Sequence, residues 1–507
     1  MSTGLRRFLY FTAAMTGAAI MIVEILGAKM LSPYIGTSHF VWTAQIAVTL
    51  VALACGYYLG GRLADRSQQL HRLFGAIFAA AVYLSFTVMV AEPVAYGCLN
   101  FNLAVGSLLA SAFLFFVPLG LLAMTGPFLV RVITSSIAGV GGNVGRLTAI
   151  STLGSFGGTM LIGYVLIPFL PNSLTMYLTA LVLMLLCVAY FVFFRRRVVG
   201  PVALLVLCAM GSGLPLKGTF HREYRLVVER FRVNSHFGDI QILDRRDSSI
   251  RYVLNDNLIQ NAYDTVLRQS PLSFSYMLAG LPAAYNPAMQ DALVVGMGVG
   301  IVPMDFVNRG MRVDTVEINP RIVEVAVRFF DFDAAKVNLV LGDGRHFLNR
   351  TSRQYDVVIL DAFLGDSFPS HLMTRETFFS ARKVLRPGGS LVVHSFGELQ
   401  PGRDFLLSSL FKTLKAVFPE VRVHTTGEGA FFFVALQEPF SGSIPTPELA
   451  GVHPAARQEV ITAFSGTAEV PGDAGLVLTD DYNPADYFDA SNREILRRRL
   501  ALAAKRM

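Results

Sequence analysis

The residues best suited to chemistry stand at the ends of four apolar runs in the second half of the chain. The first run leads into the sequence Gly-Met-Gly-Val-Gly at 296–300, and the second ends on Glu317. Asp343 and Gly344 follow the third run, and Asp361 ends the fourth. Glycines let the backbone approach a ligand, and a carboxylate that ends the second strand binds a ribose diol. This order predicts a nucleoside site, with Asp361 where the reacting group would lie.

The same runs predict the elements that must hold these residues. Apolar runs alternate with helical patterns over residues 291–436, which predicts a parallel, doubly wound, Rossmann-like sheet that 431–436 closes. A Pro-Gly-Gly turn at 387–389 before a late strand is typical of methyltransferase-type folds. No Walker lysine follows the glycines, which argues against ATP chemistry, whereas the glycines alone leave NAD open.

A small β lid is expected ahead of this core, over residues 215–260. A polar turn at 244–249 separates two of its apolar runs, and a helix is expected over 263–279. The strands of the lid are expected at 224–228, 238–243 and 250–254.

The first half of the chain is much more apolar than a soluble protein. The whole chain is 53% hydrophobic with a mean hydropathy of +0.50, and residues 1–214 hold only 14 charged side chains, 11 of them basic. A span needs about 20 apolar residues, so a multi-pass α-helical membrane domain of six or seven spans is expected. These spans are placed at 8–31, 40–61, 73–94, 103–125, 147–170, 174–194 and 198–214.

The net charge of +7 belongs to this apolar half, because residues 215–507 hold 32 basic and 33 acidic side chains. The charge therefore does not indicate nucleic-acid binding, and the expected large partner is the lipid bilayer. The basic residues of the first half fall in alternate loops, so the positive-inside rule places the N-terminus in the cytoplasm.

The side of the membrane that holds the second half depends on residues 198–214. If they span, that half faces outward; if they lie at the interface, it stays inside. Basic residues just after this stretch favour the inside, where a nucleoside cosubstrate is made. We therefore expect a multi-pass protein of the cell (inner) membrane with its catalytic domain in the cytoplasm. These basic residues are Lys217, Arg222, Arg225, Arg230 and Arg232.

Two ionisable residues, Glu24 and Lys29, lie within the first apolar stretch. Such residues are costly at membrane depth and often functional. The structural alternative is that Lys29 reaches the interface while Glu24 pairs with it or with a neighbouring span. Elsewhere, no His/Cys cluster has metal-ligand spacing, so neither a metal nor a tightly bound cofactor is expected.

The expected domains follow in order along the chain. Residues 1–214 form the membrane domain and 215–260 the lid. Residues 261–440 form the Rossmann-like transferase domain, and 441–507 a C-terminal extension that ends in a basic helix at 492–507. The sequence leaves the oligomeric state open, with a homo-oligomer as one alternative.

Taken together, these motifs resemble one family. Residues 222–437 look like the spermidine synthase (polyamine aminopropyltransferase) family, and the whole chain resembles its bacterial membrane-fused branch. The matching pieces are Asn-Asp-Asn-Leu-Ile-Gln at 255–260, Val-Gly-Met-Gly-Val-Gly at 295–300, Val-Glu-Ile-Asn at 316–319, Gly-Asp-Gly at 342–344 and the run at 355–361 that ends on Asp361.

The resemblance implies a reaction and roles for its residues. An aminopropyl group would pass from decarboxylated S-adenosylmethionine to putrescine or a related amine, releasing methylthioadenosine. By position, Gln260 and Glu317 would hold the nucleoside beside the glycine turn, Gly296 and Gly298, and Asp361 would accept the amine proton. The adenine would lie at Asp343 and Gly344.

The acceptor half departs from the family pattern. The glycine turn of the family carries an Asp where this chain has Val299, and its Tyr-His-Glu acceptor stretch is replaced at 274–276. The second Asp expected three residues after the catalytic one is Leu364 here, although Asp366 follows. A polyamine needs anions along its length, so these losses indicate a changed acceptor or none.

Other polar residues are weaker candidates. His371 is a second candidate acceptor contact beside Asp366, or else a helix-capping loop residue. The acidic turn at 479–484 either returns to the site or caps a helix, and capping is favoured. His394, at a strand end, is expected to be a structural histidine.

Two other functions stay open. One is a methyltransferase that uses S-adenosylmethionine itself, in which Val299 reflects a different end of the cosubstrate. The other is a non-catalytic transport or sensor protein with a nucleoside-binding domain, which Glu24, Lys29 and a transporter-like loop at 60–66 would support.

Overall fold

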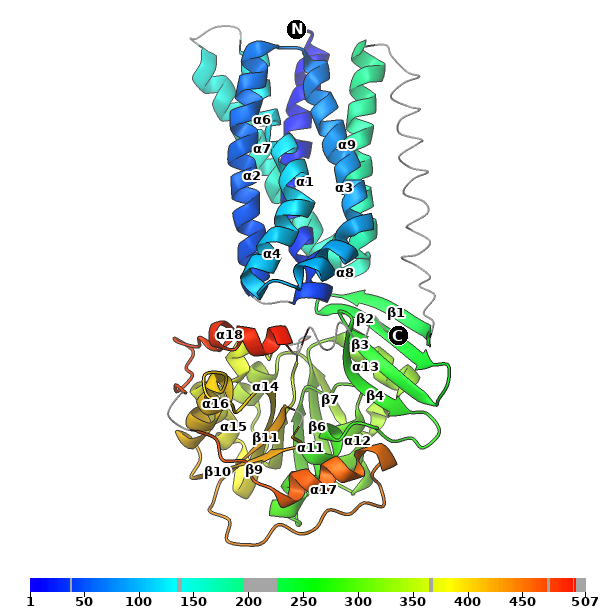
Figure 1. The fold of residues 1–507 in the computed structure, drawn as a ribbon, viewed down its shortest axis with the longest axis vertical. Coiled ribbons are helices and arrows are strands. Elements are labelled where there is room, and N and C mark those ends of the chain that lie inside the picture. The colour runs from blue at the N-terminus through cyan, green and yellow to red at the C-terminus, as the bar shows by residue number, and fades with distance from the viewer. Residues whose placement is uncertain are drawn as a thin grey trace. The chain divides into compact units, whose positions relative to one another are not determined.

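The computed structural model of the chain describes residues 1–36, 39–134, 139–195, 226–363, 368–427, 429–471, 475–495 and 497. The chain forms two compact units, Met1–Glu223 and Tyr224–Met507. The first unit is helical, and the second combines two β-sheets with helices (Figure 1).

Among the described residues, six helices of the first unit are long and apolar enough to cross a membrane. This confirms the expected helical architecture of the first half. Helices suit a membrane because the backbone of a helix satisfies its own hydrogen bonds. The seventh expected span, 198–214, lies outside the described residues. Four of the six are α1 (Thr3–Ile35), α2 (His39–Arg66), α3 (Leu70–Cys98) and α9 (Asn172–Arg195). The other two join α4 (Leu103–Ser111), η1 (Ala112–Phe116), α5 (Val117–Ala123) and α6 (Thr125–Ile133), and then α7 (Val140–Leu161), η3 (Ile162–Leu166) and α8 (Ile167–Phe169).

Helices α1 and α7 pack through small residues. A Cβ atom added at Gly154 would lie 2.1 Å from the carbonyl oxygen of Ala14, and one added at Gly158 would lie 2.6 Å from that of Ala18. Only glycine allows the two backbones to come this close, which is how small residues favour helix association in lipid.

Three polar side chains of the helical unit lack the partners that burial would favour. Glu24 and Lys29 are half-buried, and neither forms an ion pair with a described side chain. The expected pairing of Glu24 is therefore not seen among the described residues. Gln45 of α2 is fully buried opposite Gly27 of α1, and its amide atoms have no hydrogen-bond partner in the described part of the chain.

The second unit begins with an antiparallel four-stranded sheet, the predicted lid. The expected helix at 263–279 is wrong in its first part, because residues 258–264 form a fourth strand and the helix starts at Phe274. Asp256 and Asn257 have φ values of 49° and 62°, the left-handed conformation of a tight hairpin turn, which carries the chain back as a strand. The strands are β1 (Val227–Ser235), β2 (Gly238–Arg245), β3 (Ile250–Asn255) and β4 (Leu258–Asp264), paired in chain order.

The core of this unit is a seven-stranded sheet in the order β10-β11-β9-β8-β5-β6-β7. Strands β5 to β9 pair in parallel, as predicted, whereas β11 is antiparallel to both its neighbours. The expectation that 431–436 closes the sheet is wrong, since β11 lies inside it and β10 forms the edge. The strands are β5 (Asp291–Val295), β6 (Arg312–Glu317), β7 (Asn338–Leu341), β8 (Tyr355–Leu360), β9 (Leu385–Phe396), β10 (Glu420–Thr425) and β11 (Ala430–Leu436).

The order reverses at β5, which pairs with β6 on one side and with β8 on the other. Crevices for ligands form at such a switch point, outside the carboxyl ends of the strands. The helices of the unit are α11 (Phe274–Tyr285), α12 (Ile301–Asn308), α13 (Pro320–Phe329), α14 (Gly344–Arg350), α15 (Arg375–Lys383), α16 (Phe405–Lys415), α17 (Arg457–Ser465) and α18 (Ala485–Phe488). Short 3-10 turns are η4 (Ala334–Lys336), η5 (Ser370–Leu372) and η6 (Pro454–Ala456).

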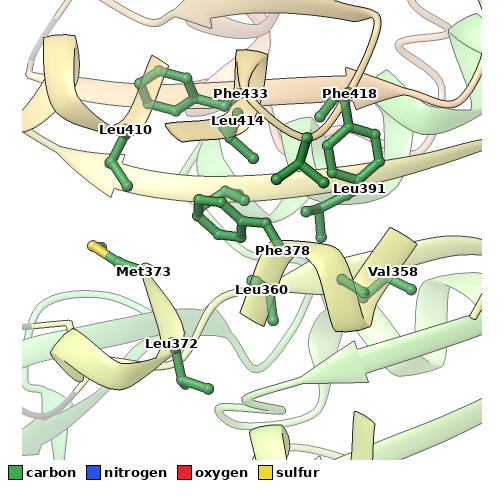
Figure 2. Packing of buried hydrophobic residues seen from close by; sticks show 14 of the residues in the cluster. Val358, Leu360, Leu372, Met373, Phe378, Leu391, Leu410, Leu414, Phe418 and Phe433 are labelled. Carbon is green, nitrogen blue, oxygen red and sulfur yellow. The ribbon is translucent and has the colours of Figure 1, made fainter. Parts of the chain in front are cut away.

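Apolar clusters cover both faces of this sheet. Alternate residues of β8 enter different clusters: Val358 and Leu360 join one, and Val357 and Ile359 the other. Side chains that alternate in this way belong to a strand buried on both faces. The packing on both faces fixes the position of the strand and of the residues at its end. In Figure 2 the first cluster includes Phe378 of α15, Leu410 and Leu414 of α16, Leu391 of β9 and Phe433 of β11.

Candidate active site

A cavity of about 280 Å³ lies at the carboxyl ends of β5, β6 and β8, at the switch point of the sheet. The chain folds so that distant predicted residues meet there. The cavity is lined by each predicted site residue that the structure describes: Gln260, Gly296, Gly298, Glu317, Asp343, Gly344, Asp361 and His371. Asp366 and Leu364 lie outside the described residues.

Gly296 begins the glycine turn after β5 and supports Asp361. Its φ is 84°, and an added Cβ would lie 2.4 Å from the carbonyl oxygen of Asp361. A side chain at this position would strain the backbone and push against the end of β8. The glycine is therefore needed for the fold of the site as well as for the approach of a ligand.

Glu317 ends β6 and is held by backbone N–H groups. Its Oε1 accepts a hydrogen bond from the N–H of Asn319 at 2.8 Å, and its Oε2 accepts one from that of Met297 at 3.2 Å. Burial raises the pKa of Glu317 to about 7, although these N–H groups oppose the shift. The carboxyl group is fixed in the wall of the cavity and changes charge near neutral pH.

Asp343 follows β7 and caps α14. Its Oδ1 accepts from the N–H of His346 at 2.8 Å, and its Oδ2 lies 2.9 Å from Nε2 of His371. Burial acts to raise the pKa of Asp343, but the His346 N–H and the His371 ring outweigh it, so this pKa is lowered. His371 thus lies beside Asp343, on the expected adenine side of the cavity; its contact with an acceptor stays a prediction.

Asp361 directly follows β8 and contacts a histidine that the sequence did not single out for chemistry. Its Oδ1 lies 2.8 Å from Nδ1 of His394, which lies in the neighbouring strand β9. The register pairs Leu360 with Val393, which places the two following residues side by side. One sequence carries no signal for this contact, because it does not show which strands are neighbours. The expectation that His394 is only structural overlooked this contact.

The cavity wall is apolar at two positions where the resemblance implies polar or charged residues. Val299 lines the cavity and is buried. Phe274 also lines it and stacks on His394 with ring centroids 5.4 Å apart. Tyr276 donates from its hydroxyl to the carbonyl of Ser270 at 2.8 Å and does not line this cavity.

The acidic turn at 479–484 has a structural role in the part that the structure describes. Asp480 accepts from Nη1 of Arg345 at 2.7 Å and from the hydroxyl of Thr374 at 2.8 Å. Thr374 is the N-cap of α15. The turn ties α14 to the start of α15, in keeping with the favoured interpretation as a turn that supports a helix end. No group of three His, Cys, Asp or Glu side chains that could hold a metal is present among the described residues.

The fold and the cavity define a methyltransferase-type α/β domain with a cavity at its switch point. Residues 272–427 match the family described as the spermine/spermidine synthase domain.

Known relatives agree with this family. A polyamine aminopropyltransferase of Vibrio vulnificus (strain CMCP6) is 36% identical over 125 residues, 24% of this chain and 41% of that protein. A probable polyamine aminopropyl transferase of Bifidobacterium longum (strain NCC 2705) is 26% identical over 236 residues, 45% of this chain and 50% of that protein. The chain thus spans half or less of the length of these two relatives. The crystal structure of spermidine synthase from Thermotoga maritima aligns with a TM-score of 0.36 and 17% identity, over 43% of this chain and 80% of that one.

Proposed function

We propose that the protein is an aminopropyltransferase that moves an aminopropyl group from decarboxylated S-adenosylmethionine to putrescine or a related small amine, releasing methylthioadenosine. The observation that carries the proposal is that two carboxylates line one cavity. Glu317, at the end of β6, is placed to bind a ribose, and Asp361, directly after β8, is the second carboxylate. The family match over residues 272–427 and the two relatives described as aminopropyltransferases support it.

The nucleoside half of the site supports the cosubstrate. Glu317 presents a fixed carboxyl group to a ribose diol, and the glycine turn beside it leaves the backbone open to the ligand. Gln260 of β4 lines the same cavity, as do Asp343 and Gly344. No nucleotide phosphate is required by this arrangement.

Asp361 is suited to activate the amine. The carbon next to the cosubstrate sulfonium is already electrophilic, but an ammonium must lose a proton before its nitrogen can attack. The nitrogen forms a C–N bond as the C–S bond breaks, and the electron pair of the C–S bond returns to sulfur. Sulfur leaves as neutral methylthioadenosine, and the proton passes to Asp361.

We also propose a multi-pass protein of the cell (inner) membrane with its catalytic domain in the cytoplasm. The six long apolar helices support the membrane location, and the basic residues in alternate loops support the orientation. A cytoplasmic site would meet a nucleoside cosubstrate where it is made.

The test is a direct assay of the full chain, purified in detergent. The protein is incubated with putrescine and either decarboxylated or intact S-adenosylmethionine, each labelled in the group that would be transferred. Labelled spermidine from the decarboxylated compound alone supports the proposal. Repeating the assay with diamines of other lengths and with monoamines would identify the preferred acceptor.

The same assay separates the two other functions. Methylated product from intact S-adenosylmethionine would indicate a methyltransferase, for which apolar Val299 in the cavity wall is the supporting observation. Binding of methylthioadenosine without either product would indicate a sensor or transport protein.

A further inference from the structure

His394 is enclosed in a way that a structural histidine does not require. Its side chain is 2% exposed, and its ring lies between Phe274 and Phe432, nearly parallel to both at interplanar angles of 11° and 6°. Burying an imidazole costs free energy unless its nitrogens are hydrogen-bonded. Among the described residues, Nε2 has no hydrogen-bond partner, and Nδ1 has only Asp361. The one polar contact that His394 makes is therefore with the proposed base.

The contact divides the two oxygens of Asp361 between different tasks. Oδ1 is held by His394 Nδ1 at 2.8 Å, and no other described side chain or N–H donates to this carboxylate. The side chain of Asp361 is still 16% exposed and lines the cavity. One oxygen is thus fixed by the protein while the other remains for a ligand.

We infer that His394 is the positioning residue for Asp361: the aromatic rings hold the imidazole, its Nδ1–H fixes one carboxylate oxygen, and the second oxygen is thereby aimed at the amine of the acceptor. The inference rests on the proposed function and extends it to a residue outside the motifs that define the site.

The surroundings of the ring leave Asp361 as the polar partner of His394 among the described residues. A positioned imidazole that orients a carboxylate or is oriented by one is a recurrent arrangement in acid–base sites. Asp361, directly after β8, is the titratable side chain that contacts His394 among the described residues. The other groups packed against the ring are aromatic: Phe274 of α11, Phe363, Phe396 of β9 and Phe432 of β11.

The test compares two substitutions of similar shape, His394→Asn and His394→Leu. Both side chains branch at Cγ, but only asparagine keeps an N–H donor near the position of Nδ1. We expect His394→Leu to lower kcat by roughly 10–100-fold, the usual effect of losing an outer hydrogen-bond partner. The pH profile of kcat should change as well, because Asp361 loses its one described hydrogen-bond partner. His394→Asn should recover most of kcat and return the profile towards the original.

A matched control is His424→Leu, since His424 is also a fully buried histidine in this unit. It bonds Tyr285 and the carbonyl of Ala463, both at 2.8 Å, and does not line the cavity. This variant should lose thermal stability while keeping the pH profile. Methylthioadenosine affinity should stay within about twofold in the His394 variants, which shows that the fold is retained.

A double-mutant cycle with Asp361→Asn separates positioning from a general structural effect. If His394 acts through Asp361, His394→Leu should lower turnover little further once Asp361 is replaced. Full additivity, or a His394→Leu enzyme with unchanged kcat and pH profile, overturns the inference. If His394→Leu does not fold, the test uses His394→Asn alone. A His394→Asn enzyme whose kcat is reduced as strongly as that of Asp361→Asn overturns the inference as well.

Failure of the proposed function would be recognised separately. A wild-type protein that transfers no aminopropyl group refutes that proposal whatever His394 does. The positioning role is then read from putrescine binding to the methylthioadenosine complex by calorimetry. Equal weakening by His394→Leu and Asp361→Asn, with recovery in His394→Asn, supports it, and unchanged binding in His394→Leu overturns it.

Discussion

Asp361 and Glu317 face one cavity, but their surroundings differ, so their removal should have different effects. Asp361→Asn keeps the size of the side chain and removes its basicity. We expect turnover to fall by roughly 10²–10⁴-fold, the usual contribution of a positioned base, with methylthioadenosine affinity nearly unchanged. Steady-state kinetics and calorimetry measure the two effects. Full turnover with the best acceptor would make Asp361 a structural strand-end residue and direct the search for a base to Asp366 or His371.

Glu317 should make nucleoside binding depend on pH. Burial raises the pKa of Glu317 to about 7, and the ionised form is the one that accepts both hydroxyls of a ribose. Methylthioadenosine should therefore bind more weakly as pH falls below about 7, and Glu317→Gln should weaken it by about 1–3 kcal/mol at higher pH. Calorimetry from about pH 5 to about pH 9 checks this. Affinity that stays constant with pH, or a Gln variant that keeps the pH dependence, would contradict it.

The same shift has the opposite sign for the stability of the empty protein. The folded-state pKa of Glu317, about 7, lies above its ordinary value of 4.5. Ionising this group therefore costs folding free energy as pH rises from about 4.5 through 7. Bound nucleoside should offset that loss, so a carboxylate that serves binding is a destabilising group without its ligand.

Most site residues could be predicted because they follow the ends of strands with strong apolar patterns. Glu317, Asp343 and Asp361 each end or follow such a run, and the parallel order brings those ends together. His394 lies inside β9, and its importance depends on the neighbour that β9 takes, which one sequence does not show. Positions of single residues were therefore more predictable than their partners.

The elements missed in the sequence are those that depend on a turn or on a neighbour. Strand β4 was hidden because Asp256 and Asn257 form a tight turn that reverses the chain, and the apolar pattern after them is short. The place of β11 between β9 and β10 could not be read from its apolar run, since any interior strand is equally apolar. Strand existence followed from periodicity, whereas strand order did not.

The amino ends of β5 and β8 should support stability without affecting the site. Arg386 bonds Asp291 at 2.7 Å and Asp356 at 3.0 Å, and Arg312 also pairs with Asp291. Arg386→Met should lower the free energy of unfolding by about 1–3 kcal/mol, because two carboxylates lose a partner, and leave methylthioadenosine affinity unchanged. Arg245→Met, which breaks an exposed pair with Asp247, is the control and should cost about 0–1 kcal/mol. Denaturant unfolding measures both.

The ion pairs of Asp291 with Arg312 and Arg386 should also make the free energy of unfolding depend on pH in acid. The hydrogen bond from Arg312, with that of Arg386, lowers the pKa of Asp291 to about 2. A lowered carboxylate pKa contributes stability above the ordinary value of 3.8, and this is lost as pH falls towards 2. Arg386→Met should weaken that dependence, and an unchanged acid unfolding curve would contradict the assignment.

The chain combines a helical unit and a transferase-type unit, and the orientation of the first decides where the second can work. We expect the loop after α2 and the second unit to be cytoplasmic, and the loop after α3 to be outside, from the distribution of basic residues. Gln68, Asn100 and Val266 are exposed in these three places. Each can report its side of the membrane as a single cysteine, after Cys55, Cys98, Cys187 and Cys208 have been replaced by alanine.

A membrane-impermeant maleimide applied to spheroplasts should label Asn100→Cys and leave Gln68→Cys and Val266→Cys unlabelled until the membrane is opened. The physical reason is that Lys and Arg are retained on the cytoplasmic side during insertion, so the loops alternate. Labelling of Val266→Cys together with Asn100→Cys in intact spheroplasts would place the second unit outside. Decarboxylated S-adenosylmethionine from the cytoplasm could not then reach Asp361 directly, and the cytoplasmic part of the proposed function would have to be abandoned. Labelling of Gln68→Cys alone would instead reverse the whole helical unit.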